Sequence, residues 1–169
     1  GNSADILYHL GRWQESEAEC RLAQDWRMSG PLYAEWWPPL VLGLLLTESR
    51  GDDEAERLVG QALLQLETVP PGQWTGHVLR SAVSVALWAH DPDGALVIAE
   101  REWPRALESD ELAVVAWAAS TCLEAAAAAA DHGRDSSDPG LIMRARAIAA
   151  HILPQAAAHI ERSAIAPSL

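Results

Sequence analysis

Residues 10–24 read LGRWQESEAECRLAQ, so an apolar segment ends at Gly11 and a charged amphipathic segment begins at once with Arg12 and Trp13. A tight turn between two antiparallel helices explains this order. A helix pair alone leaves an apolar face uncovered, and the same turn is therefore expected to recur along the chain.

The turn recurs at a spacing of about 40 residues. Gly51 lies in ESRGDDEAERLVGQALLQL, 40 positions after Gly11, and Asp91 lies in AHDPDGALVIAEREW, another 40 positions on. Each turn is followed by a small residue that would let the second helix approach the first closely: Ser16, Ala55 and Ala95. A period near 40 made of two helices is typical of α-solenoids, and the turn chemistry LGRWxExE is closest to the tetratricopeptide type.

Apolar periodicity and helix breakers predict helices and no strand. The predicted helices cover residues 4–10, 13–28, 38–48, 53–67, 74–89, 92–103, 110–131, 139–153 and 155–163. Pro104 and Pro154 are expected to end helices, and Ser109 and Asp138 to cap the helices that follow them. The chain is thus expected to be a single all-α domain over residues 1–169, a tetratricopeptide-like α-solenoid of about four antiparallel pairs (residues 1–30, 31–70, 71–108 and 109–163).

Composition excludes several classes of partner. The 169 residues carry a net charge of −12, and all 12 basic residues are arginine. A surface that binds duplex DNA needs a basic face, so direct nucleic-acid binding by this segment is not expected, and an acidic lipid surface is an equally poor partner. The longest apolar run, Pro38–Leu46, is too short to span a bilayer. Cys20 and Cys122 are expected to be buried, reduced thiols of a cytoplasmic protein.

Three stretches, LGRWQESEAECRLA, RGDDEAERLVGQALLQL and DPDGALVIAEREW, together resemble the helical-repeat region of the large ATP-binding transcription regulators of the LuxR type. The resemblance covers roughly residues 1–160. It implies a regulatory repeat domain that lies between a nucleotide-binding domain and a helix-turn-helix domain. The sequence has no GxxxxGK[ST] and no basic recognition helix, so ATPase activity and DNA binding would belong to other parts of the parent protein. The abrupt helical start agrees with a piece taken from a longer protein.

Candidate binding residues lie on the polar side of two helices that are the first members of successive pairs. They are His77, Arg80, Ser81, Ser84 and Trp88 on the first helix, and Trp117, Thr121 and Glu124 on the second. First helices line the concave face of tetratricopeptide-like solenoids, where exposed Trp and polar side chains bind peptides or small molecules. An ordinary solvated face is the simpler alternative for the same pattern.

Other aromatic and ionisable residues are interpreted as structural. Trp13 is expected to plug the gap between its helix pair and the next, and Trp36-Trp37-Pro38-Pro39 to do the same rather than form an exposed patch. The six histidines show no metal-ligand spacing, and no catalytic signature is present, so neither a metal, a cofactor nor an enzyme is expected. We therefore expect a non-catalytic scaffold that binds a protein or small-molecule effector. A stand-alone tetratricopeptide-like adaptor and, less favoured, a small helical enzyme stay open as alternatives.

Overall fold

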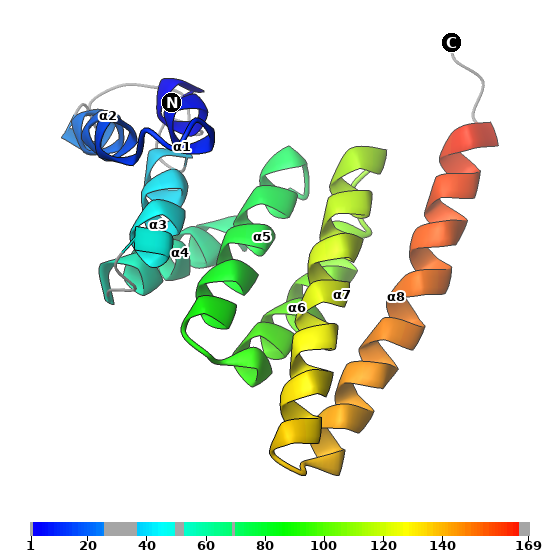
Figure 1. Ribbon diagram of the computed structural model, residues 1–169. Helices are drawn as coiled ribbons and strands as arrows, with labels where there is room; N and C mark the ends of the chain where they lie inside the picture. The colour runs from blue at the N-terminus through cyan, green and yellow to red at the C-terminus, as the bar shows by residue number, and fades with distance from the viewer. Residues whose placement is uncertain (1, 26–36, 50–52, 69, 166–169) are drawn as a thin grey trace. The chain divides into compact units, whose positions relative to one another are not determined.

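A computed structural model describes residues 2–25, 37–49, 53–68 and 70–165, and every regular element among these residues is a helix (Figure 1). The chain divides into two compact units, residues 1–68 and 69–169. The all-α prediction is confirmed. The first unit holds α1 (Asn2–His9), α2 (Trp13–Asp25), α3 (Trp37–Ser49) and α4 (Asp53–Leu66), and the second holds α5 (Gln73–Trp88), α6 (Pro92–Ala106), α7 (Leu112–Asp135) and α8 (Pro139–Ile165).

The turn between α1 and α2 has a left-handed residue at its centre, and two later turns share this geometry. The residues with positive φ are Gly11 (72°), His90 (58°) and Ser137 (56°). In each turn the next residue donates its backbone N–H to the carbonyl five positions back, at distances from 2.8 to 2.9 Å. This is the hydrogen bond of a Schellman helix end, which satisfies a carbonyl that the helix leaves unpaired. By turn geometry, His90 rather than Asp91 is therefore the equivalent of Gly11. Gly51, the predicted equivalent in the second turn, lies outside the described residues.

The residue after the left-handed one caps the next helix in the two turns of the second unit. The carboxylate of Asp91 accepts a hydrogen bond from the backbone N–H of Gly94 at 2.8 Å. Asp138 accepts from the N–H groups of Gly140 at 2.9 Å and Leu141 at 3.1 Å, as predicted for this residue. The prediction for Ser109 is wrong: α7 begins after Glu111, and the Ser109 hydroxyl accepts only the Glu111 N–H, at 3.2 Å.

The small residues after the turns are fully buried, as the repeat predicts: Ser16, Ala55 and Ala95. The Ser16 hydroxyl also donates to the backbone carbonyl of Ala4 at 2.8 Å, which joins α2 directly to α1. In the last turn the small residue lies on the first helix instead. A Cβ added at Gly133 would lie 2.9 Å from Cγ1 of Ile142, so α7 and α8 approach each other at Gly133.

Trp13 does not plug the gap between its helix pair and the next, because 41% of the residue is exposed. The buried side of α2 carries Ser16 and Cys20, and Cys20 is the α2 residue that shares a core with side chains of α3. The predicted plug is therefore wrong. The alternatives for Trp36-Trp37-Pro38-Pro39 lie outside the described part, because nothing of the Trp36 backbone or of the Trp37 and Pro38 side chains is described.

Two helices continue through the prolines that were expected to end them. Helix α6 runs past Pro104 to Ala106, and α8 runs past Pro154 as one helix. Packing on both sides of each proline explains the difference. Trp103 and Ala106 flank Pro104 and are both fully buried. Ile152 before Pro154 is fully buried, and half-buried Ala156 after it packs against the same core. Tertiary packing of this kind outweighs the hydrogen bond that an internal proline removes. Helix α7 likewise extends to Asp135, one turn beyond the predicted end.

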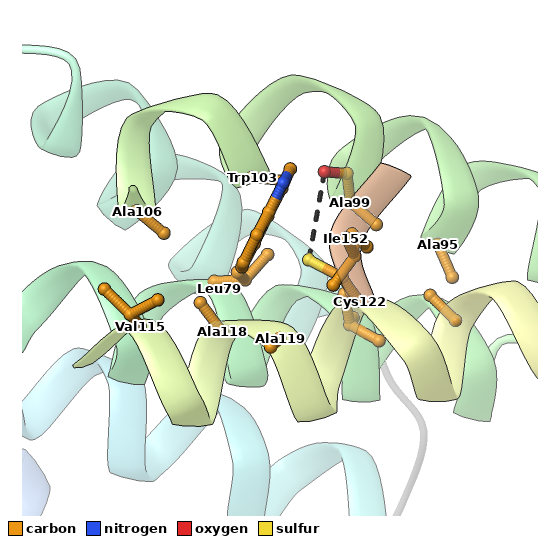
Figure 2. Packing of buried hydrophobic residues seen from close by; sticks show 12 residues of the cluster. Leu79, Ala95, Ala99, Trp103, Ala106, Val115, Ala118, Ala119, Cys122 and Ile152 are labelled. Carbon is orange, nitrogen blue, oxygen red and sulfur yellow. Dashed lines mark hydrogen bonds between the residues drawn. The ribbon is translucent and has the colours of Figure 1, made fainter. Parts of the chain in front are cut away.

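Each unit has its own apolar core. In the first unit, α3 packs against α1, α2 and α4, and the core gathers buried side chains from all four helices: Ala4, Cys20, Val41, Leu42, Leu45, Leu46, Ala55 and Leu58. In the second unit, α7 packs against α5, α6 and α8, and Trp103 and Ile152 fill the space among small side chains (Figure 2). The Trp103 indole N–H donates to Oε1 of Gln155 at 2.7 Å, which ties α6 to α8.

Both cysteines are free and buried, as predicted. Burial raises the pKa of the Cys20 thiol to about 11 and that of the Cys122 thiol to about 12. The Cys122 thiol approaches the Ala99 carbonyl oxygen at 3.9 Å in the core of the second unit (Figure 2). A thiol with so high a pKa is inert near neutral pH, because the thiolate is the reactive form.

Helix α7 is long and apolar enough, by length and composition, to cross a membrane, with a mean hydropathy of 1.6 over its 18-residue window. Half of that window is buried inside the structure. The core helix of a soluble protein can have the same length and composition.

Candidate functional site

The two predicted binding helices, α5 and α7, are neighbours. They pack against each other and run in the same direction (Figure 1). The two helices are in contact at Gly76, because a Cβ added there would lie at van der Waals distance from Trp117, 3.7 Å from its Cε3, and 3.8 Å from the Val114 carbonyl oxygen. The Trp117 ring therefore lies against the backbone of α5 near its beginning.

Trp117 also contacts the His77 ring. The two ring centroids are 5.2 Å apart and the ring planes meet at 62°, an edge-to-face arrangement. Aromatic pairs in this geometry contribute about 0.5–1.5 kcal/mol beyond the area they bury. The contact orients the indole of Trp117, although 52% of this residue stays exposed.

Six of the predicted residues form what we call the α5–α7 surface: His77, Arg80, Ser84, Trp88, Trp117 and Glu124. Trp88 is 56% exposed, and the expectation that both tryptophans are partly exposed is confirmed. Arg80 and Glu124 are exposed, whereas His77 and Ser84 are half-buried. Among the described residues Arg80 forms no ion pair, so its guanidinium is available to a ligand.

Two predicted residues do not belong to this surface. Thr121 is only 5% exposed, and Ser81 is buried, with its hydroxyl donating to the His77 carbonyl at 2.9 Å. Because α7 contacts three helices, its buried arc is wider than a single apolar stripe and includes Thr121 beside Cys122. Ser120 takes the exposed place on α7 that was expected for Thr121.

The α5–α7 surface offers aromatic faces, a guanidinium, an imidazole and a carboxylate. These groups suit recognition by stacking, cation–π contact and hydrogen bonding. No nucleophile on the surface is hydrogen-bonded to a general base within the described residues, and the same part of the chain has no group of three or more His, Cys, Asp or Glu placed to hold a metal ion.

A second candidate site, which the sequence did not reveal, is an open depression of about 430 Å³ where α6, α7 and α8 meet. It is lined by Asp93, His132, Ser136, Asp138, Gly140, Leu141 and Arg144. Arg144 donates to Asp93 at 2.7 Å and to Glu100 at 3.0 Å, and these two carboxylates raise the Arg144 pKa further above its usual value. Because Asp138 caps α8, these charged groups already have structural partners.

Residues from three separate stretches of sequence line this depression. The signal that could have indicated it is the Asp-Pro pair at residues 138–139, which marks the beginning of α8 but does not identify the partners of Arg144. A pairing between α6 and α8 across more than 40 residues has no local sequence signature. Because the charged residues of the depression pair with one another or cap α8, they have structural roles, and the α5–α7 surface remains the better candidate binding site.

Comparison with known families, with curated proteins and with solved structures finds no match for this chain. The resemblance to LuxR-type regulators consequently stays a prediction from the sequence.

Proposed function

We propose that this chain is a non-catalytic helical-repeat scaffold that binds a protein or small-molecule effector on the α5–α7 surface. In this proposal the helices form a tetratricopeptide-like α-solenoid of antiparallel pairs. The packing order supports it, because the first helix of a pair packs on both helices of the preceding pair within each unit: α3 on α1 and α2, and α7 on α5 and α6.

The observation that carries the proposal is the exposure of Trp88 and Trp117 on neighbouring helices. Transfer of an indole from water to an apolar contact is strongly favourable, so a surface with two half-exposed indoles and an exposed guanidinium gains free energy when a partner covers it. Trp and Arg are also the residues most enriched where partners bind tightly. Trp117 is held by Gly76 and His77, which lowers the entropy that it loses on binding.

The proposed setting is the cytoplasmic regulatory region of a LuxR-type transcription regulator, with DNA contacted by another domain. The net charge of −12 supports this division of labour, since it disfavours contact of this segment with phosphates. An effector on the α5–α7 surface would shift the parent between resting and active states only as far as its affinity differs between them.

A fragment screen by NMR tests the proposed surface directly. The probes are aromatic and cationic compounds of fragment size, and the readout is the set of indole N–H signals of the eight tryptophans. We expect hits that move the signals of Trp88 and Trp117. Trp117→Ala should weaken these hits tenfold or more, because truncation of such an anchor costs about 2 kcal/mol or more.

The matched control is Trp13→Ala, which removes an exposed tryptophan outside the surface and should leave the same affinities unchanged. A screen in which neither the Trp88 nor the Trp117 signal moves, or in which the hits move only the signals of other tryptophans, would contradict the proposal.

A further inference from the structure

Helix α8 carries a continuous exposed apolar stripe along its outer side. The stripe repeats at intervals of three and four residues and consists of Met143, Ala147, Ala150, Leu153, Pro154, Ala157 and Ile160, all exposed. At 1.5 Å per residue it is about 26 Å long. Side chains with this spacing form the side of a helix that normally packs against another helix.

The same positions are covered in α6. Both helices begin with proline after a capping aspartate, so Met143, Ala150 and Leu153 correspond to Leu96, Trp103 and Ala106. In α6 these three residues are fully buried, and both helices of the next pair contribute, since Leu96 packs with residues of α7 and α8 and Trp103 donates to Gln155 of α8. By position, the exposed stripe of α8 is therefore a surface for another helix pair.

Charge limits which helix can bind there. Helix α8 holds three arginines and one glutamate, a net charge of +2 in a chain whose net charge is −12. Arg146 lies at the position that corresponds to buried Ala99 of α6, and it forms no ion pair with any described residue. A helix that covers the stripe must then bring both apolar side chains and a carboxylate.

The first helix pair of the chain meets these requirements. Helix α1 exposes Ile6 and the turn after it exposes Leu10, each more than half accessible. Residues 2–25 hold five acidic and two basic residues, a net charge of −3. Exposed Glu19 on α2 has no ion-pair partner among the described residues and is available for one such as Arg146.

We propose that α8 of one copy binds the α1–α2 pair of a second copy, so that the protein associates head to tail. The packing repeats what the chain already does internally, where α7 lies on α6 and α3 lies on α2. Such a contact joins two different surfaces and leaves one of each free, so it extends into open chains instead of closing as a symmetric dimer. A stripe on one helix is smaller than the roughly 800 Å² per partner of stable interfaces, and the association is accordingly weak.

Analytical ultracentrifugation of the whole chain tests this contact. We expect the mass to rise with protein concentration at low salt and to fall back toward the monomer at high salt, because salt screens the Arg–carboxylate attraction. Leu153→Glu and Ile6→Glu should each weaken self-association tenfold or more. Both side chains are exposed, so the fold should be unaffected, and Leu64→Glu on α4 serves as a matched control that leaves association unchanged.

An equimolar mixture of Leu153→Glu and Ile6→Glu decides the geometry. Each variant keeps one intact surface, so the mixture should form a 1:1 complex and stop there. If Ile6→Glu associates as the wild type does while Leu153→Glu does not, α8 pairs with itself and the head-to-tail proposal is wrong. A monomer at all concentrations and salts, or association insensitive to both variants, also overturns it. Trp117→Ala should not change association, which separates this test from that of the α5–α7 surface.

Discussion

Two glycines of the first unit should respond to alanine in opposite directions, and this difference tests the turn between α1 and α2. Gly11 has a φ of +72°, and no atom lies within 4 Å of a Cβ built on it. Any loss of stability in Gly11→Ala therefore comes from the backbone conformation rather than from a clash. The left-handed conformation costs a residue with a Cβ about 1–2 kcal/mol. Alanine also lowers the entropy of the unfolded chain, which offsets part of this cost, so the free energy of unfolding should fall by roughly 1 kcal/mol.

Gly60 lies inside α4, and an added Cβ there likewise meets no atom within 4 Å. Its helical conformation suits alanine, so Gly60→Ala should gain about 0.5–1 kcal/mol. The two variants should then differ by roughly 2 kcal/mol in the free energy of unfolding. Because both glycines belong to the same unit, one unfolding transition reports both changes.

Urea unfolding followed by far-ultraviolet circular dichroism provides the measurement. The midpoint should fall for Gly11→Ala and rise for Gly60→Ala, with unchanged slopes, since neither variant changes the surface exposed on unfolding. A Gly11→Ala protein as stable as the wild type would show that Gly11 is not left-handed. The turn on which the helix-pair interpretation rests would then be wrong.

Three further outcomes follow from burial and charge. Trp103→Ala should destabilise the second unit by about 3–5 kcal/mol in denaturant melts, whereas Trp117→Ala and Trp13→Ala should each change stability by less than about 1 kcal/mol, because only Trp103 is fully buried. The raised pKa values of Cys20 and Cys122 make a contribution to folding stability that is fully present below pH 9 and should be lost as pH rises from 9 toward 12. Thermal melts across this range should show a smaller loss of stability in Cys122→Ala than in the wild type. Fluorescence anisotropy should detect no binding of duplex DNA at physiological salt, and salt-sensitive micromolar binding would contradict the charge argument.

The helices and their small contact residues could be predicted because their causes are local. Apolar periodicity, caps such as Asp138 and breakers such as Gly11 act within a few residues of where they stand. The left-handed conformations of His90 and Ser137 could not be read from the sequence in the same way, because neither is a glycine. Both residues are exposed, and the local hydrogen bonds from the Asp91 and Asp138 N–H groups to the carbonyls of Ala86 and Gly133 close the two turns around them.

The errors share one physical origin, which is packing between distant segments. Pro104 and Pro154 have weak helix propensity, but residues that pack into the core on both sides of each proline carry the helix through it. Thr121 is buried because three helices surround α7, a number that periodicity along one helix does not specify. Trp13 was expected to fill the gap between its helix pair and the next, but it is 41% exposed, and Cys20 is the α2 residue that packs with α3.

Solvent paramagnetic relaxation of the tryptophan indole N–H signals distinguishes an open α5–α7 surface from a buried one. Trp88 and Trp117 are more than half exposed, whereas Trp103 is enclosed and donates its N–H to Gln155. In the presence of a soluble gadolinium complex, the signals of Trp88 and Trp117 should broaden strongly and that of Trp103 should stay sharp. If the Trp88 and Trp117 signals are as protected as that of Trp103, the two residues belong to the core and the α5–α7 surface is not a binding site.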